Sequence, residues 1–317
     1  MSRLFKLIQN EQAKIYIRKS TWIMYIILFG IIIAGAFLTD KFSDLNEDYQ
    51  GDDWREVLQE ENKDLQKEME KDEYAASMNP ETIAKNNYYL ENDIQPSPYG
   101  VWNFVGENSG LMMLVSLLTI IVAGGIIANE FRWGSIKLLL IRPISRSGIL
   151  LSKYLATLLF GLYTTIFLLI ISWIVGAIFF GVGDMNPEIV KQAADGFTSV
   201  SLLEETFTQY GYQLVPLIMM ATLAFMISAV FRNSSLAIGI SIFLMMGGNT
   251  FIGFLAKKEW AKYILFANLD LSQFADGRTP MVKGLTLEFS ITMLAIYYVV
   301  FLAMSWIIFT KRDVAGQ

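Results

Sequence analysis

The chain of 317 residues contains neither cysteine nor histidine. Without cysteine it can form no disulfide, no thiolate metal site and no cysteine nucleophile. Without histidine it lacks the commonest general base and transition-metal ligand. Charge is also scarce, because only 17% of residues are charged while 54% are hydrophobic, and a soluble domain has about 25% charged residues. These shortages disfavour a soluble enzyme and indicate that lipid surrounds much of the chain.

Charge is missing most completely from six apolar segments. Each is long enough to cross a bilayer, which takes about 20 residues, and none has Asp, Glu, Lys or Arg in its interior. Because hydrocarbon offers the backbone no hydrogen-bond partners, each segment is expected to be a helix. The predicted spans are Ser20–Leu38, Asn108–Ala128, Tyr154–Gly183, Tyr212–Phe231, Ser234–Ala256 and Phe289–Phe309. The predicted fold class is therefore an all-α polytopic membrane protein.

Basic residues gather on one predicted side of the membrane. Residues 1–19 carry five basic residues and one acid, and residues 129–153 carry the same numbers. Arg232 lies in the turn between spans four and five, and residues 310–317 after span six begin with further basic residues. Lys and Arg accumulate in short cytoplasmic segments, so both termini are expected in the cytoplasm.

The opposite side is acidic. Residues 40–107 hold eighteen acids and six basic residues, and residues 184–211 hold five acids and one lysine. An apolar stripe predicts a helix of about twenty residues within the extracellular loop 39–107. The residues of this stripe are Trp54, Leu58, Leu65 and Met69. Two readings are open for this helix: a solvated cap, or an element that gates or captures substrate.

The last outer segment, residues 257–288, has mixed charge and several aromatic residues. The aromatic residues are Trp260, Tyr263, Phe266 and Phe274. This composition predicts an interfacial helix that lies at the outer headgroups.

The stretch NEFRWGSIKLLLIRPISRSGILLSKY, residues 129–154, is a basic hinge between spans two and three. We expect the helix of span two to continue several turns past Glu130. Pro143 cannot continue a helix and Ser145 can cap a new one, which predicts a helical hairpin with an exposed elbow. On charge alone, the better explanation of the hinge is the basic decoration that topology requires.

The order of residues in this hinge resembles the cytoplasmic coupling hairpin of permease subunits in ATP-binding-cassette (ABC) exporters of the second export class. That family has the six-span fold shared with the sterol and multidrug half-transporters. Its pattern is Glu, three residues, Gly, a small hydroxyl residue, an apolar turn, Pro, a polar pair with Arg, and Lys. The matching residues are Glu130, Gly134, Ser135, Leu138–Ile141, Pro143, Ser145–Arg146 and Lys153, with Ser where the family usually has Thr.

Both ends of the chain resemble the same family. Residues 1–19, with Glu11, Lys14 and Arg18, look like its amphipathic helix along the inner surface, and Phe309–Asp313 resembles its closing after span six. In family members the segment 257–288 dips back into the membrane as an upper gate. The resemblance also implies a bacterial-type plasma membrane.

The resemblance implies a permease subunit that pairs with a second copy or a paralogue and docks on two ATPase subunits. The chain has no G-x-x-x-x-G-K-[ST] loop, so ATP and Mg²⁺ are expected on those partners, and this chain is expected to have no enzymatic activity or cofactor of its own. Membrane lipid is an expected partner and nucleic acid is not. The residues expected at the ATPase interface are Glu130, Arg132, Gly134, Lys137, Arg142, Pro143, Arg146, Lys153, Arg232 and Asn233.

Glu130 is the only acid of the hinge, and two readings compete. In the first reading it pairs with Arg132 or a headgroup-facing lysine at the surface, which is worth about 0–1 kcal/mol. Alternatively it bonds a basic residue of the partner or of the N-terminal helix and carries the coupling force. We favour the second reading because of the surrounding motif.

Small residues mark where the spans can approach each other or a second copy. Those in spans two and five are Gly124, Gly125, Gly247 and Gly248, with Asn249 and Thr250 beside them. They either serve packing within the chain or line the dimer seam, which in the family is the translocation path.

The predicted function is export of an amphiphilic compound, such as a peptide antibiotic or a drug, and sodium is nearly as plausible a cargo. Two alternatives stay open. One is a secondary carrier or channel without an ATPase, although no span carries the interior charge that such a carrier usually has. The other is a membrane sensor whose extracellular helix binds a ligand and whose hinge signals to a partner.

Overall fold

The long apolar runs of the sequence form long helices. The computed structural model describes residues 3–42, 49, 51–134, 144–184, 186–193, 196–275 and 278–311. Within these ranges, six helical stretches are long and apolar enough to cross a membrane, as the sequence predicts. They are α2 (Lys19–Phe42), the run α5 to α7 (Val101–Arg132), α9 (Arg146–Phe180), α10 (Leu202–Phe231), α11 (Ser234–Leu255) and α13 (Leu287–Lys311).

The second span is a run of four short helices rather than one. It consists of α5 (Val101–Glu107), the 3₁₀ turn η2 (Asn108–Leu111), α6 (Met112–Ile126) and α7 (Ala128–Arg132). Several helices also begin earlier than the predicted spans. The second starts at Val101 and not Asn108, the third at Arg146 and not Tyr154, and the fourth at Leu202 and not Tyr212.

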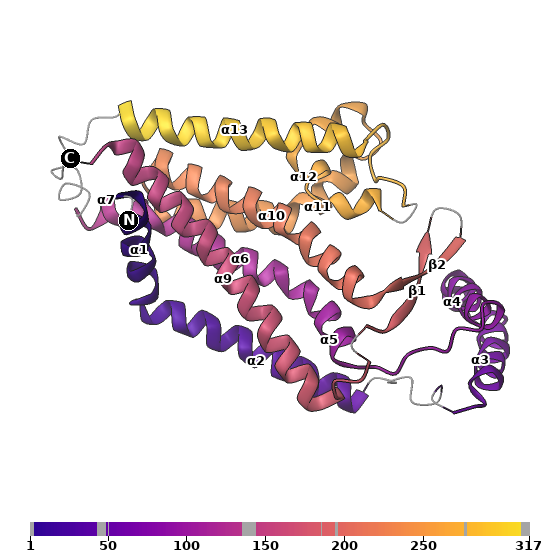
Figure 1. The fold of residues 1–317 in the computed structure, drawn as a ribbon. Helices are drawn as coiled ribbons and strands as arrows, with labels where there is room; N and C mark the ends of the chain where they lie inside the picture. The colour runs from indigo at the N-terminus through magenta and orange to yellow at the C-terminus, as the bar shows by residue number, and fades with distance from the viewer. Residues whose placement is uncertain are drawn as a thin grey trace.

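The helices form a bundle around α6 and α10, which are the most buried of the spans. α6 and α10 pack on each other, α9 packs on α2 and α6, α11 packs on α6 and α10, and α13 packs on α10. Both termini lie at one end of this bundle, and α3, α4 and the two strands lie at the other (Figure 1). α2, α11 and α13 leave most of their apolar surface uncovered within the chain.

The N-terminal residues form a separate helix, α1 (Arg3–Tyr16), that runs across the end of the bundle and not along it (Figure 1). Two side chains of α2 fix the turn between α1 and α2. Thr21 Oγ1 donates to the carbonyl of Ile15 at 2.6 Å, and Trp22 Nε1 donates to the carbonyl of Tyr16 at 2.9 Å. α1 packs on α9 and buries Glu11 and Ile15.

The described residues are mostly helical, as the predicted all-α fold requires, with one exception: a β-hairpin lies in the predicted outer loop 184–211. β1 (Glu188–Ala193) pairs antiparallel with β2 (Gly196–Ser201), with Ala193 opposite Gly196. Gly196 has a φ of 123°, a conformation that glycine adopts readily.

The predicted outer loop 39–107 contains two helices where the sequence analysis expected one. α3 (Trp54–Met69) and α4 (Glu73–Glu91) pack side by side. The predicted stripe of α3 faces inward at Trp54 and Leu58. These two side chains pack with Tyr89 of α4 and with Val190 of the hairpin. The hairpin and the two helices therefore share one small core outside the bundle.

The described part of residues 257–288, expected to be an interfacial helix or a re-entrant segment, does not form one continuous helix. The segment forms three short turns that fold back on α11 and α13: η3 (Glu259–Tyr263), α12 (Leu265–Asn268) and η4 (Leu271–Phe274). Asn268 holds them together, because its side-chain amide donates to the carbonyls of Lys262 and Ile264, each at 2.8 Å.

Candidate functional site

A helix break just before Glu130 sets the direction of that side chain. α6 ends at Ile126 and α7 begins at Ala128, whose backbone N–H donates to Ser228 Oγ of α10 at 3.1 Å. At this break, α10 satisfies the freed backbone donor. α7 then carries Glu130 to the place where α1 and α9 meet.

Four charged side chains meet there, and we call Glu11, Lys14, Glu130 and Lys153 the ionic cluster. Lys153 Nζ lies 2.8 Å from Glu11 Oε2 and 2.6 Å from Glu130 Oε1. Lys14 Nζ lies 2.6 Å from Glu11 Oε1 and 3.0 Å from Glu130 Oε1. Two ammonium groups and two carboxylates thus alternate, and they join α1, α7 and α9.

The ionic cluster is mostly shielded from solvent. The side chain of Lys153 is 0% exposed, and those of Glu11 and Glu130 are 6% and 8% exposed, while Lys14 at 38% forms the rim. Because an isolated buried charge is very costly, the equal number of charges of each sign is what makes this site possible.

The electrostatics of the two α1 residues follow from this pairing. Burial by itself would raise the pKa of Glu11, but the charges and hydrogen bonds of Lys153 and Lys14 outweigh burial and hold that pKa below its ordinary value. Burial by itself would lower the pKa of Lys14, and the bonds and charges of Glu11 and then Glu130 raise it instead. Both groups are therefore charged over a wide pH range.

These contacts connect three helices. Every ammonium and carboxylate in the cluster lies within 3.0 Å of an opposite charge inside the chain. Within the described ranges, no group of three acidic side chains is placed to hold a metal ion. What the cluster does is fix α1 to both helices that flank the basic hinge.

The placement of Glu130 agrees with one partner that the sequence analysis considered, the N-terminal helix, through Lys14. Glu130 also pairs with Lys153. The sequence analysis expected Lys153 at the ATPase interface, but its side chain is fully buried inside the chain. Glu130 is also buried, so neither side chain presents itself to another subunit in this structure. The clue in the sequence was Lys153 itself, a lysine set among apolar residues in the first turns of a long span.

The expected helical continuation of the hinge past Glu130 is wrong for its first part. α7 ends at Arg132, and Gly134 adopts a left-handed φ of 67°, which ends the helix as a glycine at this position commonly does. Ser145 does cap the next helix, because its Oγ accepts from the N–H of Gly148 at 3.1 Å. Ser135, Lys137, Arg142 and Pro143 lie outside the described residues.

Three arginines that the sequence analysis singled out make contacts of their own. The guanidinium of Arg18 lies 5.2 Å from the ring centre of Trp133, and that of Arg232 lies 4.2 Å from the ring centre of Phe131. Arg146 donates to the carbonyl of Thr310 at 3.0 Å, which ties the start of α9 to the end of α13.

Asn233 caps α11, since its Oδ1 accepts from the N–H of Leu236 at 3.1 Å. This cap lies next to Arg232, so the second predicted cytoplasmic turn packs against α7 through the ring of Phe131.

The small residues of spans two and five divide into two groups. A Cβ on Gly124 would lie 2.7 Å from Ile238 Cγ1, and one on Gly248 would lie 2.3 Å from the ring of Phe266, so both glycines serve close packing within the chain. A Cβ on Gly125 would lie 2.8 Å from the side-chain nitrogen of Asn129, at the start of α7.

The second group has no such neighbour among the described residues. A Cβ on Gly247 would meet no atom within 4 Å in this part of the chain, and Asn249 and Thr250 are exposed. These three residues lie on a face of α11 that the rest of the described chain leaves open.

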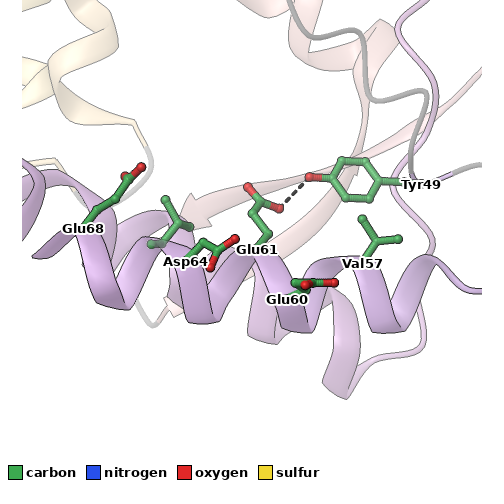
Figure 2. Close-up of a pocket in the computed structure, with 7 residues that line it drawn as sticks. Tyr49, Val57, Glu60, Glu61, Asp64 and Glu68 are labelled. Atoms are coloured by element: carbon green, nitrogen blue, oxygen red, sulfur yellow. Dashed lines mark hydrogen bonds between the residues drawn. The ribbon is translucent and has the colours of Figure 1, made fainter.

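A separate acidic cavity of about 360 Å³ lies on α3 at the other end of the bundle. Figure 2 shows Glu60, Glu61, Asp64 and Glu68 along this helix, with the hydroxyl of Tyr49 donating to Glu61 Oε2 at 2.5 Å. The cavity is acidic on the side where the sequence predicts an acidic outer surface.

The fold and the apolar helices define a membrane protein with several helices capable of crossing a bilayer. The chain belongs to the family described as "Protein of unknown function (DUF2705)", whose model matches residues 73–315. It is 46% identical over 317 residues to "Uncharacterized protein YhcI" of Bacillus subtilis (strain 168), covering 99% of this chain and 100% of that relative. It is 32% identical over 217 residues to "Uncharacterized membrane protein YdbK" of the same organism, covering 67% of this chain and 84% of that relative.

Proposed function

We propose that the chain is the membrane-spanning subunit of an ABC exporter of the second export class. It forms the transport path with a second copy or a paralogue in a bacterial-type plasma membrane, with both termini in the cytoplasm. Separate ATPase subunits bind the basic hinge and supply the energy by hydrolysing ATP with Mg²⁺.

The observation that carries this proposal is the ionic cluster. A partner that pushes on residues 131–152 must move α7, α9 or both, because these helices flank the hinge. Glu130 and Lys153 link those two helices at 2.6 Å, and Glu11 and Lys14 link them to α1. A push on the hinge then moves α1, α7 and α9 as one body, which transmits a displacement better than a loosely attached loop does.

The open face of α11 supports pairing with a second membrane subunit. Phe243, Met246 and Phe254 are 74%, 60% and 82% exposed, and the polar Asn249 and Thr250 are exposed beside them. Polar side chains on a membrane helix are favoured where another helix can accept their hydrogen bonds, and Gly247 permits close approach.

The absence of charge from the interiors of the spans supports an amphiphilic cargo and an external energy source. A proton- or ion-driven carrier usually has a titrating or coordinating side chain near the middle of the membrane. In the described helices, Glu130 and Lys153 lie near the ends of their spans and are paired with each other. Our proposed cargo is an amphiphilic compound such as a membrane-active peptide antibiotic or a drug.

Purification of the tagged chain from its native membranes in mild detergent tests the proposal. The expected result is an ATPase subunit in one-to-one ratio with this chain and ATP hydrolysis by the complex. In Glu130→Ala, we expect membrane insertion to persist and transport to be uncoupled from hydrolysis. Glu288→Ala, which removes an exposed acid at the other end of the bundle, is the matched control and should transport normally.

Two results would contradict the proposal in different ways. If the chain comes out alone and inactive from several mild detergents, it is no exporter subunit. If an ATPase accompanies it and Glu130→Ala still transports as the wild type does, the exporter stands and the cluster has no coupling role.

The acidic cavity on α3 favours a second candidate, a membrane sensor that binds a cationic ligand outside the bundle. A sensor would purify with a hinge partner that does not hydrolyse ATP. The same purification therefore separates the two candidates.

A further inference from the structure

A basic and partly apolar cavity of about 470 Å³ lies between α1 and the start of α9. Its volume falls in the range of roughly 300–1,000 Å³ that is usual for small-ligand sites. Arg3, Lys6 and Asn10 line it from α1, and the apolar side chains Leu4, Leu7 and Ile144 complete much of the wall. It opens at the end of the bundle that carries both termini.

The charge of this cavity is positive and is not neutralised inside the described chain. No carboxylate in the described ranges forms an ion pair with Arg3 or Lys6. The acids of the neighbouring ionic cluster are engaged with Lys14 and Lys153. Ser145 already caps the first turn of α9 through Gly148, so the positive charge of the cavity comes from α1.

Apolar side chains are also exposed elsewhere on α1 and beyond its end. Phe5 on α1 is 45% exposed, Ile17 in the turn after α1 is 81% exposed, and Trp22 at the start of α2 is 58% exposed. A helix with exposed apolar and basic residues at the end of a membrane bundle is typical of one that lies among lipid headgroups.

We propose that this cavity binds an anionic phospholipid, whose phosphate pairs with Arg3 and Lys6 while the upper part of its acyl chains lies against Leu4, Leu7 and Ile144. The pairing of two cations with an apolar wall in one cavity selects a lipid over a soluble anion, because a soluble anion gains nothing from the apolar side. This site goes beyond the proposed export function and does not depend on it.

Lipid retention by the purified full chain tests the site. The chain is equilibrated in mild detergent with equal amounts of phosphatidylglycerol and phosphatidylcholine, and retained lipids are counted by native mass spectrometry. Arg3→Gln with Lys6→Gln should retain less phosphatidylglycerol, by roughly fivefold for each charge removed. Retained phosphatidylcholine should not change. Lys257→Gln with Lys258→Gln removes two exposed charges at the other end of the bundle and should retain phosphatidylglycerol as the wild type does.

A second variant separates a cavity from a charged surface. Leu7→Trp fills the space without changing the charge, and it should also reduce phosphatidylglycerol retention at least several-fold. Arg3, Lys6 and Leu7 are not core residues, so an unchanged melting temperature is the check that each variant is folded.

Four outcomes would overturn the lipid site. Phosphatidylglycerol retention that neither variant lowers would mean that no such site exists. A loss in the charge variant alone would mean diffuse attraction to the surface of α1. Displacement of the lipid by an equal concentration of inorganic phosphate would reassign the cavity to a soluble phosphate. Unchanged lipid retention together with loss of a co-purifying protein would reassign it to that protein.

Discussion

Lys153 Nζ and Glu130 Oε1 lie 2.6 Å apart between the ends of two different membrane helices, and both side chains are buried. The residues flank the basic hinge, so the ion pair joins the hinge at both of its ends. Glu11 lies 2.8 Å from the same ammonium, which brings the N-terminal helix into the same contact. A cluster of this kind is sensitive to the loss of any one member, because the buried charges that remain are neither fully paired nor solvated by water.

Replacing Lys153 tests that sensitivity. Lys153→Met leaves the carboxylates of Glu11 and Glu130 facing each other with only Lys14 between them. We expect a loss of about 3–5 kcal/mol in the free energy of unfolding, measured by chemical denaturation in detergent. Lys258→Met removes an exposed lysine and should leave this free energy nearly unchanged. An equally small effect of Lys153→Met would mean that the cluster does not stabilise the bundle.

A double-mutant cycle tests whether Glu130 and Lys153 act as a pair. Glu130→Gln and Lys153→Met each leave an uncompensated charge, whereas the double variant removes both charges together. The double loss of unfolding free energy should fall short of the sum of the single losses by about 0.5–3 kcal/mol. Strictly additive losses would show that the two residues act independently.

The pH dependence of the cluster follows from the two shifted groups on α1. The pKa of Glu11 is held below its ordinary value of 4.5, so its stabilising contribution is present above pH 4.5 and is lost as the pH falls through the lowered pKa. The pKa of Lys14 is raised above 10.5, so its contribution is present below pH 10.5 and is lost as the pH rises through the raised pKa.

We therefore expect the difference in unfolding free energy between the wild type and Glu11→Gln to be constant from about pH 5 to pH 8 and to shrink only below pH 4.5. Denaturation in detergent across this range measures it. A difference that already changes between pH 7 and pH 5, growing as the pH falls, would mean that burial, and not the lysines, controls the pKa of Glu11.

Gly124 tests the close approach of α6 and α11. In Gly124→Ala the new Cβ would lie 2.7 Å from Ile238 Cγ1 and 3.2 Å from its backbone nitrogen. The two helices must move apart, which should cost about 1–3 kcal/mol and lower the melting temperature. Gly30→Ala on α2, where a Cβ meets no atom of the described chain within 4 Å, is the control and should not lower it.

The lack of native cysteine makes the proposed pairing through α11 easy to test. Thr250→Cys places a thiol on the open face of α11, and mild oxidation in native membranes should give a disulfide-linked dimer on a non-reducing gel. Ile26→Cys on α2, where Ile26 is 66% exposed, is the matched control and should stay monomeric. A dimer from Ile26→Cys alone would move the subunit contact away from α11.

The sequence predicted the membrane bundle well because its signal is local. Each span is a long apolar run that has to be helical in hydrocarbon, and the six predicted runs appear as six helical stretches among the described residues. The hairpin β1–β2 was missed because its two short strands are stable only through packing of Val190 and Phe197 on the outer helices. That packing joins segments about a hundred residues apart, and no local pattern reports it.

The site shows the same division between local and distant information. The sequence by itself determined that Glu130 is a lone acid in a basic hinge and that Lys153 and Lys14 lie near the ends of apolar runs. Only the tertiary structure decided that these charges are buried together. The break at Ile127 and the crossing of α1 over α9 bring each ammonium nitrogen within 3.0 Å of two carboxylate oxygens. A charge on a membrane helix can face a headgroup, another subunit or an ion-pair partner, and which of these it meets depends on how the helices pack.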